Sequence, residues 1–332
     1  MPQEQLIGIA RIAHAAPELQ RKNFATYSQL ASFKLLNRCD SRRVPFDWTI
    51  NPYRGCEFGC VYCYARYTHE FMELRDPLEF ETRIFAKQWN PAQFRADLRR
   101  IDPRESIAIG TATDPYQPAE RRYGLTRSIL GTLAEEPKGQ RRIWITTKSD
   151  LVSRDVDLLS ELKRRGNVVT VNVTVTTVDT DLARKLEPMA PRPDLRLRAV
   201  AELARAGIAV GVSYAPILPL INDRRGQMEA LAQAASTAGA QWMWGGVVFL
   251  SATTKPVFFA FLEREFPHLL GKYKRHFAGN NAYLKGDYPA RIKERLSEIN
   301  QRYGLKKQGQ EAEDWEQARQ QIGDAAQLSL QF

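Results

Sequence analysis

The sequence predicts an α/β fold with a parallel sheet of six strands. Two observations support this class: short apolar or β-branched runs recur along the chain, and amphipathic segments of helical period separate them. Repeated strand-then-helix units form parallel sheets with right-handed crossovers. Periodicity alone leaves open whether the sheet closes into a barrel. The six strand segments are residues 46–51, 106–111, 142–147, 168–177, 208–216 and 244–250.

The segments between the later strands carry the signature of amphipathic helices. Apolar residues recur in them at helical spacing, and three segments finish with a glycine, at Gly166, Gly207 and Gly239. Glycine readily adopts the left-handed conformation that closes many helices, so its position supports a helix in each segment. The four segments are residues 125–136, 151–166, 195–207 and 226–239.

Three regions flank the predicted core of residues 46–254. Residues 1–45 are predicted to form an N-terminal extension, an irregular lead with a short helical piece. Residues 255–307 are predicted to be helical and carry many aromatic side chains, with twelve Lys and Arg against five Asp and Glu. Residues 308–332 are polar, which predicts a loose helix or a disordered tail.

The composition favours a cytoplasmic protein. Hydrophobic residues make up 43% of the chain and charged residues 26%, as in ordinary globular proteins. The N-terminus lacks the features of a signal peptide, and no apolar stretch approaches the ~18 residues that span a bilayer. In a reducing compartment, clustered cysteines are expected to bind metal or take part in catalysis. The net charge of +10 permits a polyanionic partner and equally fits a solvated basic surface.

Three of the four cysteines lie in the stretch TINPYRGCEFGCVYCYAR, residues 49–66, directly after the first predicted strand. Cys56, Cys60 and Cys63 have the spacing Cys-x3-Cys-x2-Cys, and three thiolates this close can bind one soft metal centre. Zinc would need a fourth ligand, for which His69 is the nearest later histidine. An iron–sulfur cluster suits three thiolates better, and a four-iron cluster would keep one iron open for a small molecule.

Polar residues also follow the other predicted strands. In parallel βα folds, functional groups collect at the C-terminal ends of the strands and in the loops beyond them. The cysteines therefore fall where chemistry is expected. The other polar strand ends are TATDPYQPAE (111–120), TTKS (146–149), TVTT (174–177) and YAPILPLIND (214–223).

The cysteine motif, with Tyr62 just before its third cysteine, resembles that of the radical S-adenosylmethionine (SAM) superfamily. The segments TATDPYQPAE, TTKSDLVSRD and LEPMAPRPDLRLRAV narrow the resemblance to the spore photoproduct lyase-like, or DNA repair photolyase-like, group. The resemblance covers roughly residues 46–250. It implies a partial (β/α)6 barrel of the radical SAM type, with N-terminal and C-terminal extensions.

The resemblance also implies an enzyme with two cofactors. A [4Fe–4S] cluster bound by Cys56, Cys60 and Cys63 would hold SAM at its open iron and cleave it to methionine and a 5′-deoxyadenosyl radical. That radical would take a hydrogen atom from the substrate. The cofactors supply this chemistry, and the protein orients them and excludes competing reactions. A reductant such as flavodoxin or ferredoxin would supply the electron.

By the same resemblance, four residues near the cluster contact or order SAM. Tyr62 and Tyr64 would pack near the adenine and the cluster. Lys148 would meet the SAM carboxylate, and Asp114 would order the loop that carries it. Taken from the residues alone, Lys148 equally fits a solvated surface lysine, and the two tyrosines fit core aromatics.

The later strand ends complete the implied SAM site. Thr174 or Thr176 and the backbone around Ala215 would line the adenosyl group. The arginines of segment 192–198 have an open role: they either cap a helix, pair with acids or contact a ligand. The polar pair at 222–223 also fits the start of the next helix.

The sequence differs at one position from the characterised lyase of this group. That lyase has a cysteine at the end of its second strand, and this cysteine returns a hydrogen atom to the repaired base. Thr111 stands at the matching position, and a threonine O–H bond is too strong to donate hydrogen readily to a carbon radical. Cys39 is expected to be a bystander thiol, unless the fold brings it into the site. Repair of the spore thymine dimer by the lyase's route is therefore not expected.

Three functions are consistent with the sequence. In the first, the radical enzyme acts on nucleic acid, and the bases and aromatics of residues 255–307 contact phosphates and stack on nucleobases. In the second, the same chemistry acts on a peptide or a small molecule. In the third, the chain is a non-catalytic iron–sulfur module. The aromatics have a competing explanation, which is packing under the open side of a partial barrel: Phe266, Tyr273, Phe277, Tyr283 and Tyr288.

Overall fold

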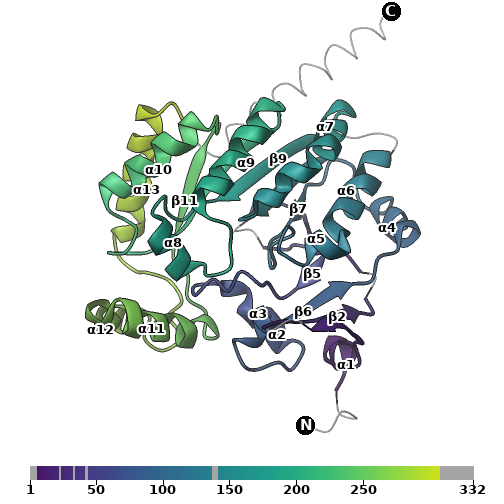
Figure 1. Ribbon diagram of the computed structural model, residues 1–332, viewed down its shortest axis with the longest axis horizontal. Helices are drawn as coiled ribbons and strands as arrows, with labels where there is room; N and C mark the ends of the chain where they lie inside the picture. The colour runs from purple at the N-terminus through teal and green to yellow at the C-terminus, as the bar shows by residue number, and fades with distance from the viewer. Residues whose placement is uncertain (1–5, 22–23, 33, 42–43, 137–140, 307–332) are drawn as a thin grey trace, which may run out of the picture.

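The computed structural model describes residues 6–21, 24–32, 34–41, 44–136 and 141–306. Its main sheet has seven strands in the order β11–β10–β9–β8–β7–β4–β3 (Figure 1). Every pairing from β4 to β11 is parallel, which confirms the six predicted strands, and β3 runs antiparallel to β4. The strands are β3 (Leu36–Arg38), β4 (Trp48–Ile50), β7 (Ile107–Ile109), β8 (Arg142–Thr147), β9 (Val168–Thr174), β10 (Ala209–Ile217) and β11 (Met243–Val247).

The two faces of the main sheet differ in chemistry because side chains alternate between them along each strand. In β9, Val169, Val171 and Val173 belong to the largest hydrophobic core. The alternate positions Thr170 and Asn172 point to the other face, which we call the inner face. Strand β9 is therefore apolar towards the helices and polar towards the inner face.

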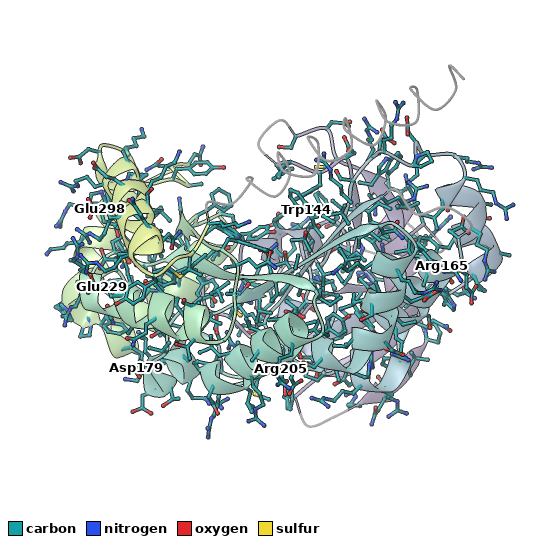
Figure 2. The ribbon with its side chains drawn as sticks, turned by 90° about the horizontal axis from the view of Figure 1, so that it is seen from above. Trp144, Arg165, Asp179, Arg205, Glu229 and Glu298 are labelled. Atoms are coloured by element: carbon teal, nitrogen blue, oxygen red, sulfur yellow. The ribbon has the colours of Figure 1, made fainter. Side chains whose placement is uncertain are left out.

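Helices from the crossovers cover the apolar face (Figure 1). In Figure 2, Trp144 of β8 lies on the opposite side of the sheet from Arg205 of α9. The four predicted helical segments are confirmed, although residues Asp150–Asp155 form a 3-10 helix, η3, ahead of α7. The helices are α6 (Leu125–Glu135), α7 (Val156–Arg164), α9 (Pro193–Arg205) and α10 (Arg225–Thr237).

Glycines close three of these helices, as the sequence predicts. Gly166, Gly207 and Gly239 have φ values of +90°, +71° and +82°, in the left-handed region where a Cβ is strained. After Gly166, the amide of Asn167 reaches back to the carbonyl of Leu162, and the same pattern follows the other two glycines. This is the Schellman arrangement, which turns the chain into the next strand.

A second, four-stranded sheet has the order β1–β2–β6–β5. The short N-terminal helix is confirmed as α1 (Gly8–His14), but the prediction of an irregular lead is wrong, because β1, β2 and β3 all lie there. These strands are short and partly polar, and the parallel partner of β2 comes more than fifty residues later in the chain. The strands of this sheet are β1 (Glu18–Arg21), β2 (Thr26–Leu30), β5 (Tyr53–Arg54) and β6 (Arg83–Lys87).

The remaining helices are short or lie at the C-terminus. Helices α11 and α12 pack in one hydrophobic cluster with α8, and α13 packs on β11 and α10. The helical prediction for residues 255–307 is confirmed over α11, α12 and α13, but residues 277–287 and 303–306 are not helical, and the predicted tail, residues 308–332, lies outside the described residues. The remaining helices are η2 (Tyr64–Arg66), α2 (Tyr67–Glu70), α3 (Glu79–Thr82), α4 (Pro91–Leu98), α5 (Glu120–Tyr123), α8 (Thr180–Leu186), α11 (Thr254–Glu265), α12 (Pro267–His276) and α13 (Tyr288–Arg302).

Within the described residues, none of the helices combines the length and the apolar character that crossing a bilayer requires.

Candidate active site

The three motif cysteines lie on the loop that follows β4, at the C-terminal edge of the parallel sheet. We call residues 55–63 the cysteine loop. Cys56 and Cys60 are buried, Cys63 is half-buried, and all three are free thiols. They belong to a hydrophobic cluster with Phe58 of the same loop and with side chains of α8, α11 and α12. The loop thus presents three sulfur atoms in a largely apolar environment.

Gly55 and Gln117 fix the backbone of the cysteine loop. Gly55 has a φ of +81°, and a Cβ there would lie 2.8 Å from two carbonyl oxygens of segment 80–83, so the position requires glycine. Its carbonyl oxygen accepts hydrogen bonds from Thr113 Oγ1 (2.6 Å) and Gln117 Nε2 (3.0 Å). Gln117 Oε1 accepts from the amide of Glu57 (3.1 Å). The loop after β7 therefore holds the cysteine loop in place.

Arg66 and Thr254 hold the far end of the same loop. The buried guanidinium of Arg66 donates Nη2 to the carbonyl of Cys60 (3.0 Å) and forms an ion pair with Glu81 (2.5 Å). From α11, Thr254 Oγ1 donates to the carbonyl of Cys63 (2.9 Å). Neither residue was singled out from the sequence, since a lone arginine and a lone threonine carry no distinguishing pattern.

Burial dominates the acid–base properties of the cysteines. It raises the pKa of all three thiols, to about 12 for Cys60, while the nearby ammonium of Lys148 acts in the opposite direction on Cys60 and Cys63. Thiols bind metal as thiolates, so a metal centre here must displace protons as it binds.

The donor set fits an iron–sulfur cluster better than zinc. Among the residues that the structure describes, no group of three or more His, Cys, Asp or Glu side chains is arranged to hold a single metal ion. In a cluster each thiolate binds a different iron, so the sulfurs need not converge on one point. His69, the alternative zinc ligand, is buried, donates Nε2 to the carbonyl of Arg83 (2.9 Å) and packs against Phe80. Among the described residues, His69 thus belongs to no group arranged to hold a single metal ion with the cysteines.

A buried acid, Glu187, lies under the cysteine loop. It accepts hydrogen bonds from the hydroxyl of Tyr62 and from Thr176 Oγ1 (3.0 Å), and it pairs with Arg196 (2.5 Å). Burial by itself raises the pKa of Glu187, but Arg196 and Lys148 outweigh it and hold that pKa below its ordinary value. Of the three roles considered for the arginines of segment 192–198, Arg196 therefore has the second, pairing with an acid. Glu187 itself was missed, because one carboxylate in an irregular segment gives no signal.

Lys148 is held above Tyr62 by the loop after β7. Asp114 accepts hydrogen bonds from Thr147 Oγ1 (2.6 Å) and from the amide of Lys148 (2.7 Å). Lys148 Nζ lies 5.7 Å from the centroid of the Tyr62 ring. Burial by itself lowers the pKa of Lys148, but its interactions with the acidic groups of Cys60, Glu187 and Asp114 raise that pKa above its ordinary value. The lysine is therefore a fixed cation beside the cysteine loop.

The end of β9 lies beside the strand that leads to Lys148, and the end of β10 lies one strand further along the sheet. Thr174 and Thr176 are buried, and Ala215 is half-buried in β10. Asn222 donates Nδ2 to the carbonyl of Thr176 (2.8 Å) and so links the two strand ends. The alternative that Asn222 starts a helix is wrong, because α10 begins at Arg225.

Tyr64 and Thr111 form the exposed rim of the site. The Tyr64 side chain is 45% exposed, and its hydroxyl donates to the carbonyl of Thr111. Thr111 Oγ1 accepts from Asn51 Nδ2 (3.1 Å). Beyond Tyr64 lie the rings of Phe249, at 6.4 Å between centroids, and then Tyr283, at 4.8 Å from Phe249. An aromatic row thus leads away from the cysteine loop.

Cys39 lies at the other edge of the sheet. Its amide donates to the carbonyl of Asp47 (2.8 Å), directly before β4, whereas the cysteine loop leaves the far end of that strand. Four residues of extended chain, about 13 Å, separate Asp47 from Asn51. The fold therefore does not bring Cys39 into the site.

Comparisons with known proteins agree with this geometry. The family model of the Radical SAM superfamily matches residues 50–232. An uncharacterized protein of Mycobacterium tuberculosis is 32% identical over 307 residues, which cover 92% of this chain and 88% of that protein. An uncharacterized protein of Methanocaldococcus jannaschii is 29% identical over 176 residues, 53% of this chain and 61% of that protein.

The fold is also found among solved structures. A spore photoproduct lyase mutant with bound AdoMet and dinucleoside spore photoproduct superposes with a TM-score of 0.65, covering 91% of this chain and 87% of that chain. The two sequences are 17% identical, so the likeness establishes the fold, a partial parallel barrel.

A parallel partial barrel with three cysteines beyond its first strand defines the class of radical SAM enzymes. The present chain belongs to the Radical SAM superfamily. Its cofactors are a [4Fe–4S] cluster and SAM.

Proposed function

We propose that this radical SAM enzyme acts on nucleic acid and that Cys56, Cys60 and Cys63 bind its cluster. The cluster assignment rests on one observation: three free sulfurs on a single braced loop, at the C-terminal edge of the sheet. Bound there, the cofactors supply hydrogen-atom abstraction through reductive cleavage of SAM.

The chain's own residues would bind and orient SAM. Lys148, fixed by Asp114 and held beside the cysteine loop, offers a cation to the SAM carboxylate. Tyr62 and Tyr64 flank the third cysteine, one buried and one at the rim. The strand ends that would line the adenosyl group are Thr174, Thr176 and Ala215.

Nucleic acid as the substrate is supported by α12 and by the aromatic row. Tyr273 and Phe277 are buried against the core, so they pack as structural aromatics. Lys272, Lys274 and Arg275 lie exposed on the same helix. At the rim, Tyr64, Phe249 and Tyr283 offer rings on which bases can stack. These features suit a single strand with exposed bases better than a neutral small molecule.

We also propose that the fate of the substrate radical differs from that in the lyase. Thr111 occupies the second strand end with its hydroxyl bonded to Asn51, and Cys39 lies at the other edge of the sheet. A protein thiol would therefore not return the hydrogen atom.

We further propose that flavodoxin or ferredoxin supplies the electron and that residues 46–254 form the catalytic core.

The test is anaerobic reconstitution of the full chain with iron and sulfide, followed by iron analysis and measurement of 5′-deoxyadenosine. We expect about four irons per chain, and more 5′-deoxyadenosine with single-stranded DNA or RNA than with a peptide mixture or no addition. Cys56→Ala, Cys60→Ala and Cys63→Ala should each lose the cluster absorbance, whereas the control Cys39→Ala should keep it. A full cluster in any of the first three variants would contradict the assignment. Equal product with and without nucleic acid would contradict the substrate.

A further inference from the structure

Two tryptophans, Trp244 of β11 and Trp242 just before this strand, lie on the inner face of the main sheet. Their neighbours Met243 and Gly245 face the helices: Met243 belongs to the main core, and a Cβ at Gly245 would lie 2.6 Å from Leu296 of α13. Because side chains alternate along a strand, Trp242 and Trp244 point to the opposite face.

The two indoles differ in whether their N–H group has a hydrogen-bond acceptor. Trp242 is 1% exposed and donates Nε1 to Asn172 Oδ1 (2.9 Å). It lies across Gly211, where a Cβ would come within 2.1 Å of the ring, so this indole is built into the sheet. The Nε1 of Trp244 is also buried, but it has no acceptor among the residues the structure describes. A buried N–H group is normally paired, so this donor lacks the partner that the described residues would be expected to supply.

The strand register places Trp244 in the same row as the proposed SAM site. Trp244 is paired with Ser213, and Ser213 with Thr174. Continuing the pairing of β8 with β9 by one residue brings Lys148 opposite Thr174. Strands lie about 4.8 Å apart, so the Cα atoms of Trp244 and Thr174 are about 10 Å apart. A molecule beside the adenosyl group would therefore reach the indole.

The next positions along β10 and β11 leave space beside this ring. These positions hold Ala215 and Gly246, the two smallest residue types. A Cβ added at Gly246 would have Trp244 Cζ3 at 3.5 Å and the Cβ of Ala215 at 3.9 Å as its nearest neighbours, both ordinary contact distances. The open space thus borders the six-membered ring of the indole, and the unpaired Nε1 lies at the opposite edge of the same flat ring.

We propose that Trp244 determines substrate specificity by donating its N–H group to a carbonyl oxygen or ring nitrogen of a nucleobase. This inference rests on the proposed function, because it uses the SAM site as its reference point. The indole N–H is a donor only, so it selects a hydrogen-bond acceptor. Its flat face favours a planar ring over an aliphatic chain.

The test measures how the reconstituted full chain with SAM binds two fluorescein-labelled oligonucleotides of equal charge. One is tetrathymidylate. The other replaces its bases with difluorotoluene, a thymine-shaped ring without strong acceptors. Trp244→Phe keeps a ring but removes the donor. The control is Trp48→Phe, because Trp48 lies in β4 and donates its N–H group to Glu105.

We expect the wild-type protein and Trp48→Phe to bind tetrathymidylate about 3- to 10-fold more tightly than its mimic, the contribution of one hydrogen bond. Trp244→Phe should lose this preference while keeping its iron content and its Kd for SAM. A wild-type protein that binds both oligonucleotides equally overturns the proposal, whether or not the variant folds. So does a Trp244→Phe protein that retains the preference. If neither oligonucleotide binds, both substrate proposals fail, while iron content and SAM binding still report separately on the cluster assignment.

Discussion

At the scale of single residues, Lys148 is a charged residue of the site that takes no part in holding the cysteine loop. The Nζ of Lys148 lies 5.7 Å from the centroid of the Tyr62 ring, and Asp114 fixes the backbone of Lys148 by accepting hydrogen bonds from its amide and from Thr147 Oγ1. The sulfurs are held by backbone hydrogen bonds that do not involve Lys148. Cluster binding and SAM binding should therefore be separable by mutation.

Lys148→Ala should keep the iron content and weaken SAM binding about tenfold or more, because a charged hydrogen bond contributes roughly 1.5–3 kcal/mol. The measurement is anaerobic calorimetry with SAM after iron analysis. Lys163→Ala is the matched control, since Lys163 is exposed on α7 and donates to the carbonyl of Gly207. An unchanged Kd for Lys148→Ala would remove this residue from the SAM site.

His69 gives a pH dependence at the same scale. Burial lowers its pKa to about 4, against about 6.5 in the unfolded chain. Above pH 6.5, His69 is neutral in both the folded and the unfolded chain, and its protonation does not reduce the free energy of unfolding. As the pH falls from 6.5 to 4, His69 binds a proton in the unfolded chain but stays neutral in the folded chain. The free energy of unfolding therefore decreases by about 1.4 kcal/mol per pH unit.

The wild-type protein should therefore lose about 2 kcal/mol more between pH 7 and pH 5 than His69→Gln, as measured by urea unfolding. His276→Gln, at an exposed position of α12, is the control and should follow the wild type. Parallel pH profiles for the wild type and His69→Gln would show that His69 is protonated in the fold.

At the scale of elements, one ion pair links the cysteine loop to β9 and to the segment between α8 and α9. Glu187 receives the Tyr62 hydroxyl, and Arg196 donates to the carbonyl of Thr174 (3.1 Å). Both partners are at most 1% exposed. The pair therefore sets the distance between the loop that carries the cysteines and the strand that would line SAM.

Glu187→Ala should destabilise the protein by about 3–5 kcal/mol, because it leaves Arg196 buried without its partner. The same segment offers a control in the exposed pair of Arg192 with Asp194, where Asp194→Ala should change stability by less than about 1 kcal/mol. Urea unfolding of the two variants measures the contrast. Equal effects would mean that water reaches Arg196 in the fold.

The elements also show where sequence reasoning works. The strands of the parallel sheet were predicted because both the β-branched runs and the helical segments between them are long enough to show their period. The four-stranded sheet was not, because its strands do not form repeated strand-then-helix units, and β2 pairs with β6, a partner distant in sequence. The cysteines stood out by their spacing. Glu187 and Trp244 acquire their roles through contacts between distant segments, which spacing does not reveal.

At the scale of the whole molecule, the C-terminal helices join the cysteine loop to a basic surface. Tyr273 of α12 and Phe277, directly after this helix, belong to the hydrophobic cluster that contains the cysteines. With its apolar side turned inward, α12 exposes Lys272, Lys274 and Arg275. A nucleic-acid strand on this surface would lie on a helix that packs directly in the cluster of the proposed active site.

Binding of single-stranded DNA should therefore weaken with salt, and α12 should account for part of that dependence. Each phosphate contact contributes about 0.7 to the slope of log K against log salt for a single strand. Replacing Lys272, Lys274 and Arg275 together by Gln should thus lower the slope by about 2. Fluorescence anisotropy with an oligonucleotide between 50 and 300 mM salt measures it.

A matched triple variant separates this contact from the net charge of the protein. Arg99, Arg100 and Arg104 are exposed at the end of α4 and just beyond it, and α4 lies at the opposite side of the molecule from α12 (Figure 1). Their replacement by Gln removes the same three charges, but at 0.1 M salt the Debye length is about 10 Å, so their field does not reach a strand on α12. The slope should then stay at the wild-type value. If both triple variants lowered the slope equally, binding would follow the overall charge, and α12 would have no special part in it.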